Sequence, residues 1–580
     1  MLDNTSFMRY ILSASQAQSE QGQTHKGQKE MRLDKNQTIT VFNPNEKDED
    51  SLYLQMKIGE FPRLGEPVKD RNGADVYSVP PGVQVLSVDP VTGQKGWYDV
   101  SAFTCEKGCK TVEVKFGSRS VIVSDNESLA AFDPEQGRLV KVAPSETKEK
   151  FIPTLRKAGQ PFGRFGSRDL GWLFGAFISD GWTTDRCVGY CKLEKIKRDE
   201  FVRIMRSFHE NFTVVEYSAD KNTEPLKLGK STKIHLNSTT LGEWWSQWHF
   251  VDRNHPGESR RTATCKCIDA RMLQYGSEEF MWGLLSGLLD GDGSFSINKA
   301  TGKKRFGCRF STSSIKLKEA LCTLCYRLGI RTSVTTTPPR GFSGTAFTVC
   351  LSSVDMWNNL DKLTCVGERE KCIISDWKEN KPAEDRNDQI PLSLDELNTI
   401  RGLCFPKGDT SPLYSATHRP AESGAPHIAR FILAKFADLI KEALPNLYAR
   451  CIATDTVWEK VDSVEDTGTR DVFDIMVADS KVYVVNDGVV VWDTVNIHVP
   501  VSDNARKEAL EKMLPSRNLT TLSNHKIMNK PEKEYLQGLY IATRMGKQSP
   551  GGVRKFNSLE EARAAHRRGE IDVDTPIDLV

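Results

Sequence analysis

The 580-residue sequence lacks long apolar runs, strong net charge and a dense set of cysteines. No stretch reaches the roughly 20 consecutive apolar residues of a membrane-spanning helix, so we expect no membrane partner. A net charge of +2 indicates neither a polybasic nor a polyacidic chain. Fourteen cysteines in a chain of this length predict reduced thiols rather than a disulfide scaffold. Close cysteine pairs are also typical of zinc sites, but Cys322 and Cys325 follow an apolar helical period, which predicts core positions instead.

The N-terminal residues MLDNTSFMRYILSASQ have neither a basic lead nor a clean apolar core, so they do not predict a secretory signal. We therefore expect a cytoplasmic protein, in a bacterial or phage-infected cell. The length predicts about three to five domains. Local patterns predict an exposed helix over 13–32, strands over 39–42 and 52–57, and helices over 504–518 and 558–570.

Histidine is scarce, with 10 in the chain and none between Ser78 and Gln160 or between Cys451 and Asp493. These two stretches alternate apolar and polar residues and are punctuated by Gly, Pro and Asp, which predicts strands joined by hairpins. They flank a mixed α/β centre at about residues 165–450. Because insertions succeed at exposed loop tips, this arrangement predicts one β domain interrupted by an insertion.

Two segments of the centre resemble each other: LFGAFISDG at Leu173–Gly181 and LSGLLDGDG at Leu285–Gly293. Each predicts an apolar helix that ends in an acid and a glycine. A buried helix that ends in Asp-Gly would explain a single copy of this segment. The presence of two copies instead favours a functional role for the acids. Glycines within the helices would let them pack closely and place Asp180 beside Asp292. Paired carboxylates are suitable ligands for hard divalent cations, which can activate water for phosphoryl displacement.

These segments resemble the paired motifs of LAGLIDADG homing endonucleases. The stretch FGCRFSTSSIKLKEALCTLCYRLGIRTSV is similar to the strand–serine–helix segment that follows the second motif in that family. The resemblance covers about residues 165–380. It implies a pseudo-symmetric αββαββα fold, a monomeric Mg²⁺-dependent nuclease, and a saddle-shaped sheet on a long asymmetric site in double-stranded DNA. It also implies that Asp180 and Asp292 are the catalytic metal ligands. Ile178 and Ser179 depart from the motif in the first copy.

Basic residues near the expected strands are the candidate DNA contacts, because phosphate contacts supply affinity and base contacts specificity. For any single basic run, a solvated face explains the charge equally well. A binding module that does not cut, as LAGLIDADG maturases act on RNA, is a further alternative. The candidates are Lys192, Lys304, Arg305, Arg309 and Arg331.

The β-rich flanks resemble inteins, the self-splicing protein elements. The segments SVPPGVQVLSVD and VIVSDNESLAAFD are similar to the first two intein blocks, and DVFDIMV and VYVVNDGVVVWDT to the last two. The resemblance implies that Ser78 is the first nucleophile, Thr494 the second, and Asp493 the terminal residue that cyclises. It places Asp474 at the acid of the penultimate block. The threonine and histidine of the second block correspond to Ser124 and Glu127.

The intein pattern is incomplete, since Trp492 and Asp493 stand where the family has histidine and asparagine. The usual general acid–base and oxyanion partners are therefore missing. An aspartate can cyclise to an anhydride or be hydrolysed, but when ionised it is a poorer electrophile than an amide. Two hypotheses follow. Either splicing takes an altered route through Glu127 and Asp493, or splicing is slow or lost.

The last segment, DTVNIHVPVSDNARKEALEKMLPSRNL, is similar to the β′ subunit of multi-subunit RNA polymerases just after its metal-binding motif. The resemblance implies host polymerase subunits as partners after splicing. Joining residue 77 to residue 494 gives GADVYTVNIHVP, which keeps only Asp75 of that motif's three aspartates. We therefore expect no polymerase activity from this chain.

Together these patterns predict a multi-domain α+β protein: an all-β splicing (Hint) domain interrupted by an αββαββα endonuclease and flanked by host segments. The expected parts are an N-terminal host segment (1–77), a split Hint domain (78–160 and 451–493), the endonuclease (165–380), a helical extension (381–450) and a β′-like host segment (494–580). The alternative is a splicing-inactive and nuclease-inactive intein remnant in a polymerase-subunit precursor.

Overall fold

The computed structural model describes residues 33–46, 52–69, 74–90, 92–125, 129–148, 150–184, 186–218, 232–251, 263–298, 304–339, 344–382, 385, 388–404, 427–477, 479–493, 507, 511–512, 553–571 and 575–579. Contacts divide the chain into two units, Met1–Val495 and Asn496–Val580, and each is described by itself.

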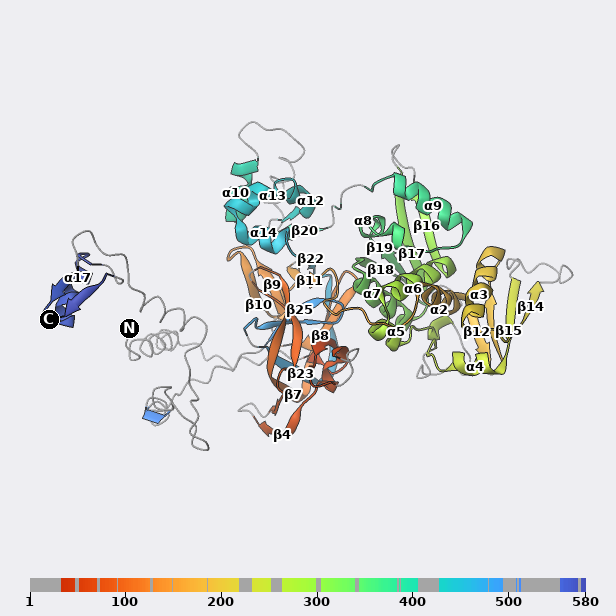
Figure 1. Cartoon of the computed structure of the whole chain (residues 1–580), viewed down its shortest axis with the longest axis horizontal. Coiled ribbons are helices and arrows are strands. Elements are labelled where there is room, and N and C mark those ends of the chain that lie inside the picture. The colour runs from red at the N-terminus through yellow and green to blue at the C-terminus, as the bar shows by residue number, and fades with distance from the viewer. Residues whose placement is uncertain are drawn as a thin grey trace. The chain divides into compact units, whose positions relative to one another are not determined.

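The β-rich part of the first unit is a 15-stranded sheet made from sequence-distant halves (Figure 1). The long strands β7 (Lys95–Phe116) and β23 (Ser463–Val477) pair antiparallel, with register shifts at three points along β23. Strands β11 (Phe151–Leu155) and β22 (Thr456–Lys460) also pair. The intervening chain therefore leaves and re-enters at neighbouring strands. The remaining strands of these halves are β6 (Gln84–Val88), β8 (Arg119–Ser124), β9 (Leu129–Asp133), β10 (Arg138–Val142), β24 (Val482–Val485) and β25 (Val489–Trp492).

Strands before residue 78 belong to the same sheet. β1 (Leu33–Asp34) pairs with β23 and β8, and β2 (Thr38–Phe42) pairs with β24 and β6. They are followed by β3 (Tyr53–Lys57), β4 (Leu64–Lys69) and β5 (Asp75–Ser78). Strands on both sides of residue 77 therefore share one sheet and one core. β2 and β3 match the strands predicted there, whereas the helix predicted over 13–32 lies outside the described residues.

The centre repeats one order of elements twice. The first copy is α2 (Arg168–Asp180), β12 (Gly181–Thr184), β13 (Cys187–Cys191), α3 (Lys195–Phe208), β14 (Thr213–Ser218), β15 (Thr232–Asn237) and α4 (Thr239–Ser246). The second is α6 (Glu278–Gly291), β16 (Gly293–Asn298), β17 (Arg305–Thr312), α7 (Ile315–Leu328), β18 (Thr332–Thr337), β19 (Ala346–Leu351) and α8 (Ser353–Trp357). Helix α5 (Ala270–Tyr275) precedes the second copy and α9 (Glu368–Glu379) follows it. Each copy forms a four-stranded antiparallel sheet. The order of elements within each copy is αββαββα, the order that the resemblance to LAGLIDADG endonucleases implied.

Helices α2 and α6 pack with their main chains in close approach. A Cβ atom built on Gly175 would lie 2.3 Å from the carbonyl oxygen of Leu284, and one on Gly287 would lie 2.1 Å from that of Trp172. Real Cβ atoms do not approach this closely, so glycine is required at these positions. Serine N-caps start both helices: Ser167 accepts from the amide of Leu170 in α2, and Ser277 starts α6 in the same way.

Residues 389–451 form a helical segment on the β sheet. Its core combines buried residues of its own helices, such as Ile400, Ile440 and Cys451, with Phe132 and Trp458 from the sheet. Its elements are β20 (Gln389–Pro391), α10 (Leu394–Cys404), β21 (His427–Ala429), α12 (Arg430–Ala434), α13 (Ala437–Ala443) and α14 (Pro445–Cys451). Strands β20 and β21 pair antiparallel, so this segment has its own short sheet and helices.

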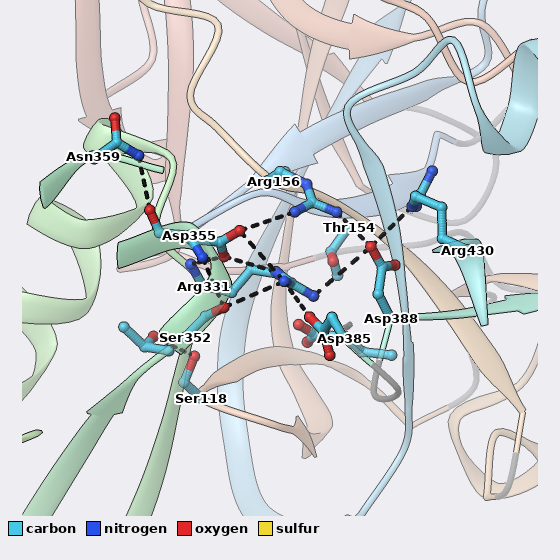
Figure 2. Close-up of polar contacts among 12 residues, drawn as sticks. Ser118, Thr154, Arg156, Arg331, Ser352, Asp355, Asn359, Asp385, Asp388 and Arg430 are labelled. Atoms are coloured by element: carbon cyan, nitrogen blue, oxygen red, sulfur yellow. Dashed lines mark hydrogen bonds and ion pairs between the residues drawn. The ribbon is translucent and has the colours of Figure 1, made fainter. Parts of the chain in front are cut away.

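A network of charged side chains joins the β sheet, the second repeat and the helical segment (Figure 2). Arg156, just after β11, lies 3.2 Å from Asp355 of α8 and 2.5 Å from Asp388, before β20. Arg331, before β18, pairs with Asp355 at 2.9 Å, and Arg430 of α12 pairs with Asp388 at 2.9 Å. Both aspartates are buried. Three parts of the chain thus meet through shared carboxylates.

The second unit contains helix α17 (Leu559–Arg567) beside the parallel pair β26 (Arg554–Phe556) and β27 (Ile577–Leu579). Ser558 caps the helix by accepting from the amide of Glu561, which confirms the helix predicted over 558–570. Most of the helix predicted over 504–518 lies outside the described residues. Across the described parts of both units, no helix has the length and apolarity to span a membrane.

The α2–α6 contact generates a stability prediction. We expect Gly175→Ala to lower the free energy of unfolding by at least about 1–3 kcal/mol, because the added methyl group meets a main-chain carbonyl that cannot rotate away. Gly402→Ala in α10 is the matched control, since a Cβ there meets open space. Thermal unfolding of both variants checks this, and equal stability of G175A and wild type would contradict the close packing.

Candidate functional site

The ends of helices α2 and α6 bring two acids together. Asp180 is the last residue of α2, and Asp292 is the C-terminal cap of α6. A Cβ atom on Gly291 would lie 3.4 Å from the Oδ2 atom of Asp180, so the first acid reaches the end of the second helix. The carboxyl groups are partly exposed, at 23% for Asp180 and 36% for Asp292. Both are therefore accessible to a bound molecule.

Two lysines bracket the acids and tie the helix ends together. Lys192 donates to Asp180 Oδ2 at 2.6 Å and to the carbonyl oxygen of Gly291 at 2.8 Å. Lys266 donates to the carbonyl oxygen of Ser179 and lies 3.5 Å from Asp292 Oδ2. Each lysine thus contacts an acid of one repeat and the main chain of the other repeat's motif. Positive charge next to the acids is also available to a phosphate group.

The environment of Asp292 opposes its ionisation. Burial raises its pKa, the neighbouring Asp180 charge raises it further, and Lys266 and Lys192 act in the opposite direction. The net pKa lies above the ordinary value for aspartate. Like charges held close together are a known cause of perturbed carboxyl groups at functional sites. Burial also raises the pKa of the nearby Tyr190 phenol well above its ordinary value.

The donor set fits a hard divalent cation only when further ligands are added. The two carboxylates and the Gly291 carbonyl are oxygen donors of the kind that Mg²⁺ prefers. Among the residues that the structure describes, no group of three or more acidic, histidine or cysteine side chains could hold a metal ion. An ion here would therefore take additional ligands from water and from a bound phosphate, which is usual for Mg²⁺.

The two four-stranded sheets each have one buried and one open face. In the second sheet Phe306, Cys308 and Phe310 point into the core, while Arg305 and Arg309 alternate with them on the open face. Arg309 lies opposite Ser294 of β16, directly after the second motif. These two arginines are therefore the sequence-predicted contacts that a ligand on this face can reach.

The other predicted DNA contacts lie elsewhere. Lys192 is at the acid pair, as described above. Lys304 pairs with Asp376 of α9 at 2.6 Å. Arg331 is only 13% exposed and is held by the aspartates at 355 and 385, so it belongs to the network of Figure 2 rather than to the open face. Its position two residues after a helix-ending glycine gave no sign of these distant partners.

An aromatic row on the first sheet was not predicted from the sequence. The His235 ring contacts the Trp182 ring at 5.3 Å and the Tyr217 ring at 4.7 Å between centroids. Trp182 follows the first motif directly, and its neighbours in the row come from β15 and β14. Lys266 was missed as well. Predicting this row would have required the register of strand pairing, which the pattern of a single sequence does not reveal.

The described residues assigned to splicing lie on strands β5, β8 and β23 and directly after β25. Ser78 ends β5 and is exposed, whereas Ser124, at the end of β8, is buried. Asp474 is buried in β23 and accepts from the hydroxyl of Tyr483 at 2.8 Å. Within the described part of the chain, no hydrogen bond connects Ser78 to Asp493. Glu127 and Thr494 lie outside the described residues.

Asp493 is fixed in a buried position at the end of β25. Its Oδ2 atom accepts from the amide of Val477 at 2.8 Å, and its own amide donates to the carbonyl oxygen of Lys481 at 2.7 Å. Its Oδ1 atom is buried without a hydrogen-bond partner. Burial raises the pKa of this carboxyl above its ordinary value, against the opposing effect of the Val477 amide. One carboxyl oxygen thus accepts a hydrogen bond, while the other is buried without one.

The raised pKa of Asp292 yields a prediction about stability. The folded protein binds this proton more tightly than the unfolded chain, so ionising the carboxyl at neutral pH opposes folding. Asp292→Asn should therefore raise the melting temperature at pH 7, by about 2–4 °C for each kcal/mol relieved. The gain should vanish below the unfolded aspartate pKa of about 4. Thermal unfolding at both pH values tests this, with exposed Asp199→Asn as control; an unchanged or lower melting temperature at pH 7 contradicts it.

Comparisons with solved structures give likenesses that cover part of the chain. The homing endonuclease I-DmoI in complex with DNA and Ca is similar over 36% of this chain and 96% of its own, with 10% identity and a TM-score of 0.24. An intein from a hyperthermophile is similar over 22% of this chain and 72% of its own, with 14% identity and a TM-score of 0.18.

Sequence comparisons identify two further relationships. Residues 279–363 match the family model of the LAGLIDADG-like domain. The RNA polymerase β′ subunit of Thermus thermophilus is 38% identical over 87 residues, and that of Chloroflexus aggregans is 32% identical over 85. Each alignment covers 15% of this chain and only 6% of the relative, so the chain spans a small part of those subunits. The chain therefore carries a LAGLIDADG-like domain at residues 279–363 and a stretch of 87 aligned residues that is similar to RNA polymerase β′.

Proposed function

We propose that this chain is an intein-containing precursor whose central domain cuts double-stranded DNA and whose β domain splices the protein. The observation that carries the nuclease is the meeting of Asp180 and Asp292 at the ends of two glycine-packed helices. Each acid ends the first helix of its repeat and directly precedes the first strand of that repeat's sheet. A pseudo-symmetric site of this kind suits two cuts on opposite DNA strands.

The cleavage site would use Mg²⁺ held by Asp180 and Asp292. The ion, when bound, lowers the pKa of a bound water and stabilises charge on the phosphate in an in-line displacement. Lys192 and Lys266 hold the acids in place and add positive charge beside the scissile phosphate. The perturbed pKa of Asp292 agrees with this role, because an incoming cation would favour the ionised carboxyl.

A long asymmetric DNA site would lie along the open faces of the two sheets. Arg305 and Arg309 supply phosphate or base contacts from the second sheet. The row of Trp182, His235 and Tyr217 gives the first sheet a different, aromatic character. Two unlike half-surfaces on one chain suit an asymmetric site and a nuclease that works as a monomer.

Splicing is the second activity proposed for the chain. Ser78 would accept the upstream acyl group, Thr494 would take it over, and cyclisation of Asp493 would release the joined host segments, with Ser124, Glu127 and Asp474 near the reaction centre. The buried, hydrogen-bonded position of Asp493 supports its role. A remnant that no longer splices is the alternative, favoured by the absence of histidine from both β-rich stretches.

The host segments would act in a polymerase context. The β′ matches suggest that a spliced product associates with other polymerase subunits in the cytoplasm. We propose residues 1–77 and 494–580 as host segments, 78–160 and 451–493 as the splicing domain, 165–380 as the endonuclease and 381–450 as a helical extension.

The nuclease proposal predicts a specific DNA cut. Incubation of the purified full chain with DNA spanning the uninterrupted insertion point should give double-strand cleavage that requires Mg²⁺. Asp180→Asn should abolish the cut while leaving DNA binding in a gel-shift assay, because the metal ligand is lost and the sheet faces are intact. Asp199→Asn on α3 is the matched control. Failure of the wild-type chain to cut this DNA would refute the nuclease.

The splicing proposal predicts a smaller product. Expression of the full chain should yield a protein of about 18 kDa that joins residues 1–77 to 494–580, in proportion to the 65.1 kDa of the precursor. Mass spectrometry of the junction peptide identifies it. Asp493→Asn should increase the yield, because an ionised carboxyl is a poorer electrophile than an amide. Persistence of the full-length chain in both forms would show that splicing is lost.

A further inference from the structure

The carbonyl group at the downstream splice junction has a charged neighbour. The Nζ atom of Lys141 donates to the carbonyl oxygen of Asp493 at 3.2 Å. Splicing, as proposed above, breaks the bond between this carbonyl carbon and the nitrogen of Thr494. The oxygen that Lys141 contacts is therefore the one that gains negative charge when the carbonyl carbon is attacked. Donors aimed at such an oxygen are among the largest contributions to catalysis of acyl transfer.

The fold delivers Lys141 to this oxygen from a distant part of the sequence. Strands β10, β9 and β25 are neighbours in the sheet, and Val142, Leu129 and Val491 lie in one row across them. Lys141 directly precedes Val142 on β10, and Trp492 directly follows Val491 on β25. Because successive side chains of a strand point to opposite faces, Lys141 and Trp492 both lie on the face opposite to the row. An extended lysine can cross the intervening strand diagonally, within the reach of neighbouring strand residues.

A small residue beside Lys141 and an aromatic ring near its ammonium group position this side chain. Its direct neighbour on β9 is Ala130, whose methyl group leaves room for the lysine side chain to pass. The Nζ atom then lies 5.7 Å from the centre of the Trp492 ring, a cation–π contact. Trp492 occupies the position where the intein pattern has histidine. A tryptophan there cannot act as a proton donor to the carbonyl, but its ring holds an ammonium group that can.

The attacking group is also in place. Asp493 Oδ2 is held by the amide of Val477, and its Oδ1 atom is buried without a hydrogen-bond partner. The amide of Asp493 is anchored to the carbonyl oxygen of Lys481. The main chain on the upstream side of the junction is thereby fixed, with the carboxyl group of the same residue beside its own carbonyl carbon.

We propose that Lys141 is the oxyanion donor of the downstream cleavage and replaces the histidine that the sequence lacks. This assignment rests on the proposed splicing activity. A carboxylate oxygen of Asp493 attacks its own carbonyl carbon, and the bond from that carbon to the Thr494 nitrogen breaks. The nitrogen takes a proton from water and leaves as an amine. The resulting five-membered cyclic anhydride is then opened by a second water. Lys141 stabilises the negative oxygen in the intermediate between attack and bond breaking.

The test measures release of residues 494–580 from the full chain by mass spectrometry over time. Lys141→Met should slow release by about 10²–10³-fold, as removal of one oxyanion donor does elsewhere. Lys141→Arg, which keeps a charged donor, should retain most of the rate. Lys148→Met, at an exposed position after β10, is the matched control and should leave the rate unchanged. Thermal stability and DNA cleavage should be the same in all four proteins, because Lys141 is exposed.

The same series is made with Asp493→Asn, whose side-chain amide attacks the same carbonyl carbon. If release occurs in either background and Lys141→Met leaves its rate unaltered, the assignment of Lys141 is overturned while splicing stands. If release occurs only with asparagine and depends on Lys141, the assignment holds and the natural chain is the splicing-inactive remnant. Absence of release in both backgrounds overturns the splicing proposal and the role of Lys141 together.

Discussion

The close contact between helices α2 and α6 is the constraint on which the candidate nuclease depends. Their separation is set by glycines, since a methyl group at Gly175 or Gly287 would meet the other helix's main chain. Only at this separation do the two helix ends place Asp180 and Asp292 in one electrostatic environment. The repeated sheets follow directly from the helix ends, so the same contact also sets the relation between the two open faces. The geometry of the acid pair and the relation between the two open faces therefore share one structural origin.

Buried charged side chains fix the relative positions of the β sheet, the second repeat and the helical segment of the first unit. Burial alone would raise the pKa of Asp388, but the guanidinium groups of Arg430, Arg156 and Arg331 hold it below its ordinary value. The carboxylate is thus ionised in the folded chain, and its contribution to stability is present at neutral pH and is lost as pH falls through the lowered pKa. A buried carboxylate that lost one of these arginines would keep its desolvation cost with less compensation. The network therefore favours one arrangement of β sheet, second repeat and helical segment.

Local sequence patterns predicted the parts of the molecule whose signals are local. The two motif helices, the meeting of their acids and the helix capped by Ser558 follow from residue spacing and capping chemistry. Pairing between distant strands has no such signal, which is why the contribution of Leu33 and Ile39 to the 15-stranded sheet was not foreseen. Arg331 is a second example of a residue whose distant partners local sequence patterns did not predict. Its charge suggested DNA, but its actual partners are aspartates brought near by the fold.

The end of strand β25 and the two central repeats are not structurally independent, although the intervening chain leaves and re-enters the β sheet at neighbouring strands. Strand β25 begins after a tight turn that contains Asp487. Helix α7 of the second repeat reaches this turn, where Thr323 donates to Asp487 at 2.9 Å, and Arg119 donates to the Asp487 carbonyl at 2.7 Å. Burial raises the pKa of the Asp487 carboxyl to about 6, against the opposing effects of the Thr323 hydrogen bond and the Arg119 charge. The turn that positions β25, and through it Asp493, is therefore stabilised partly by helix α7, and removing the two central repeats would remove this hydrogen bond.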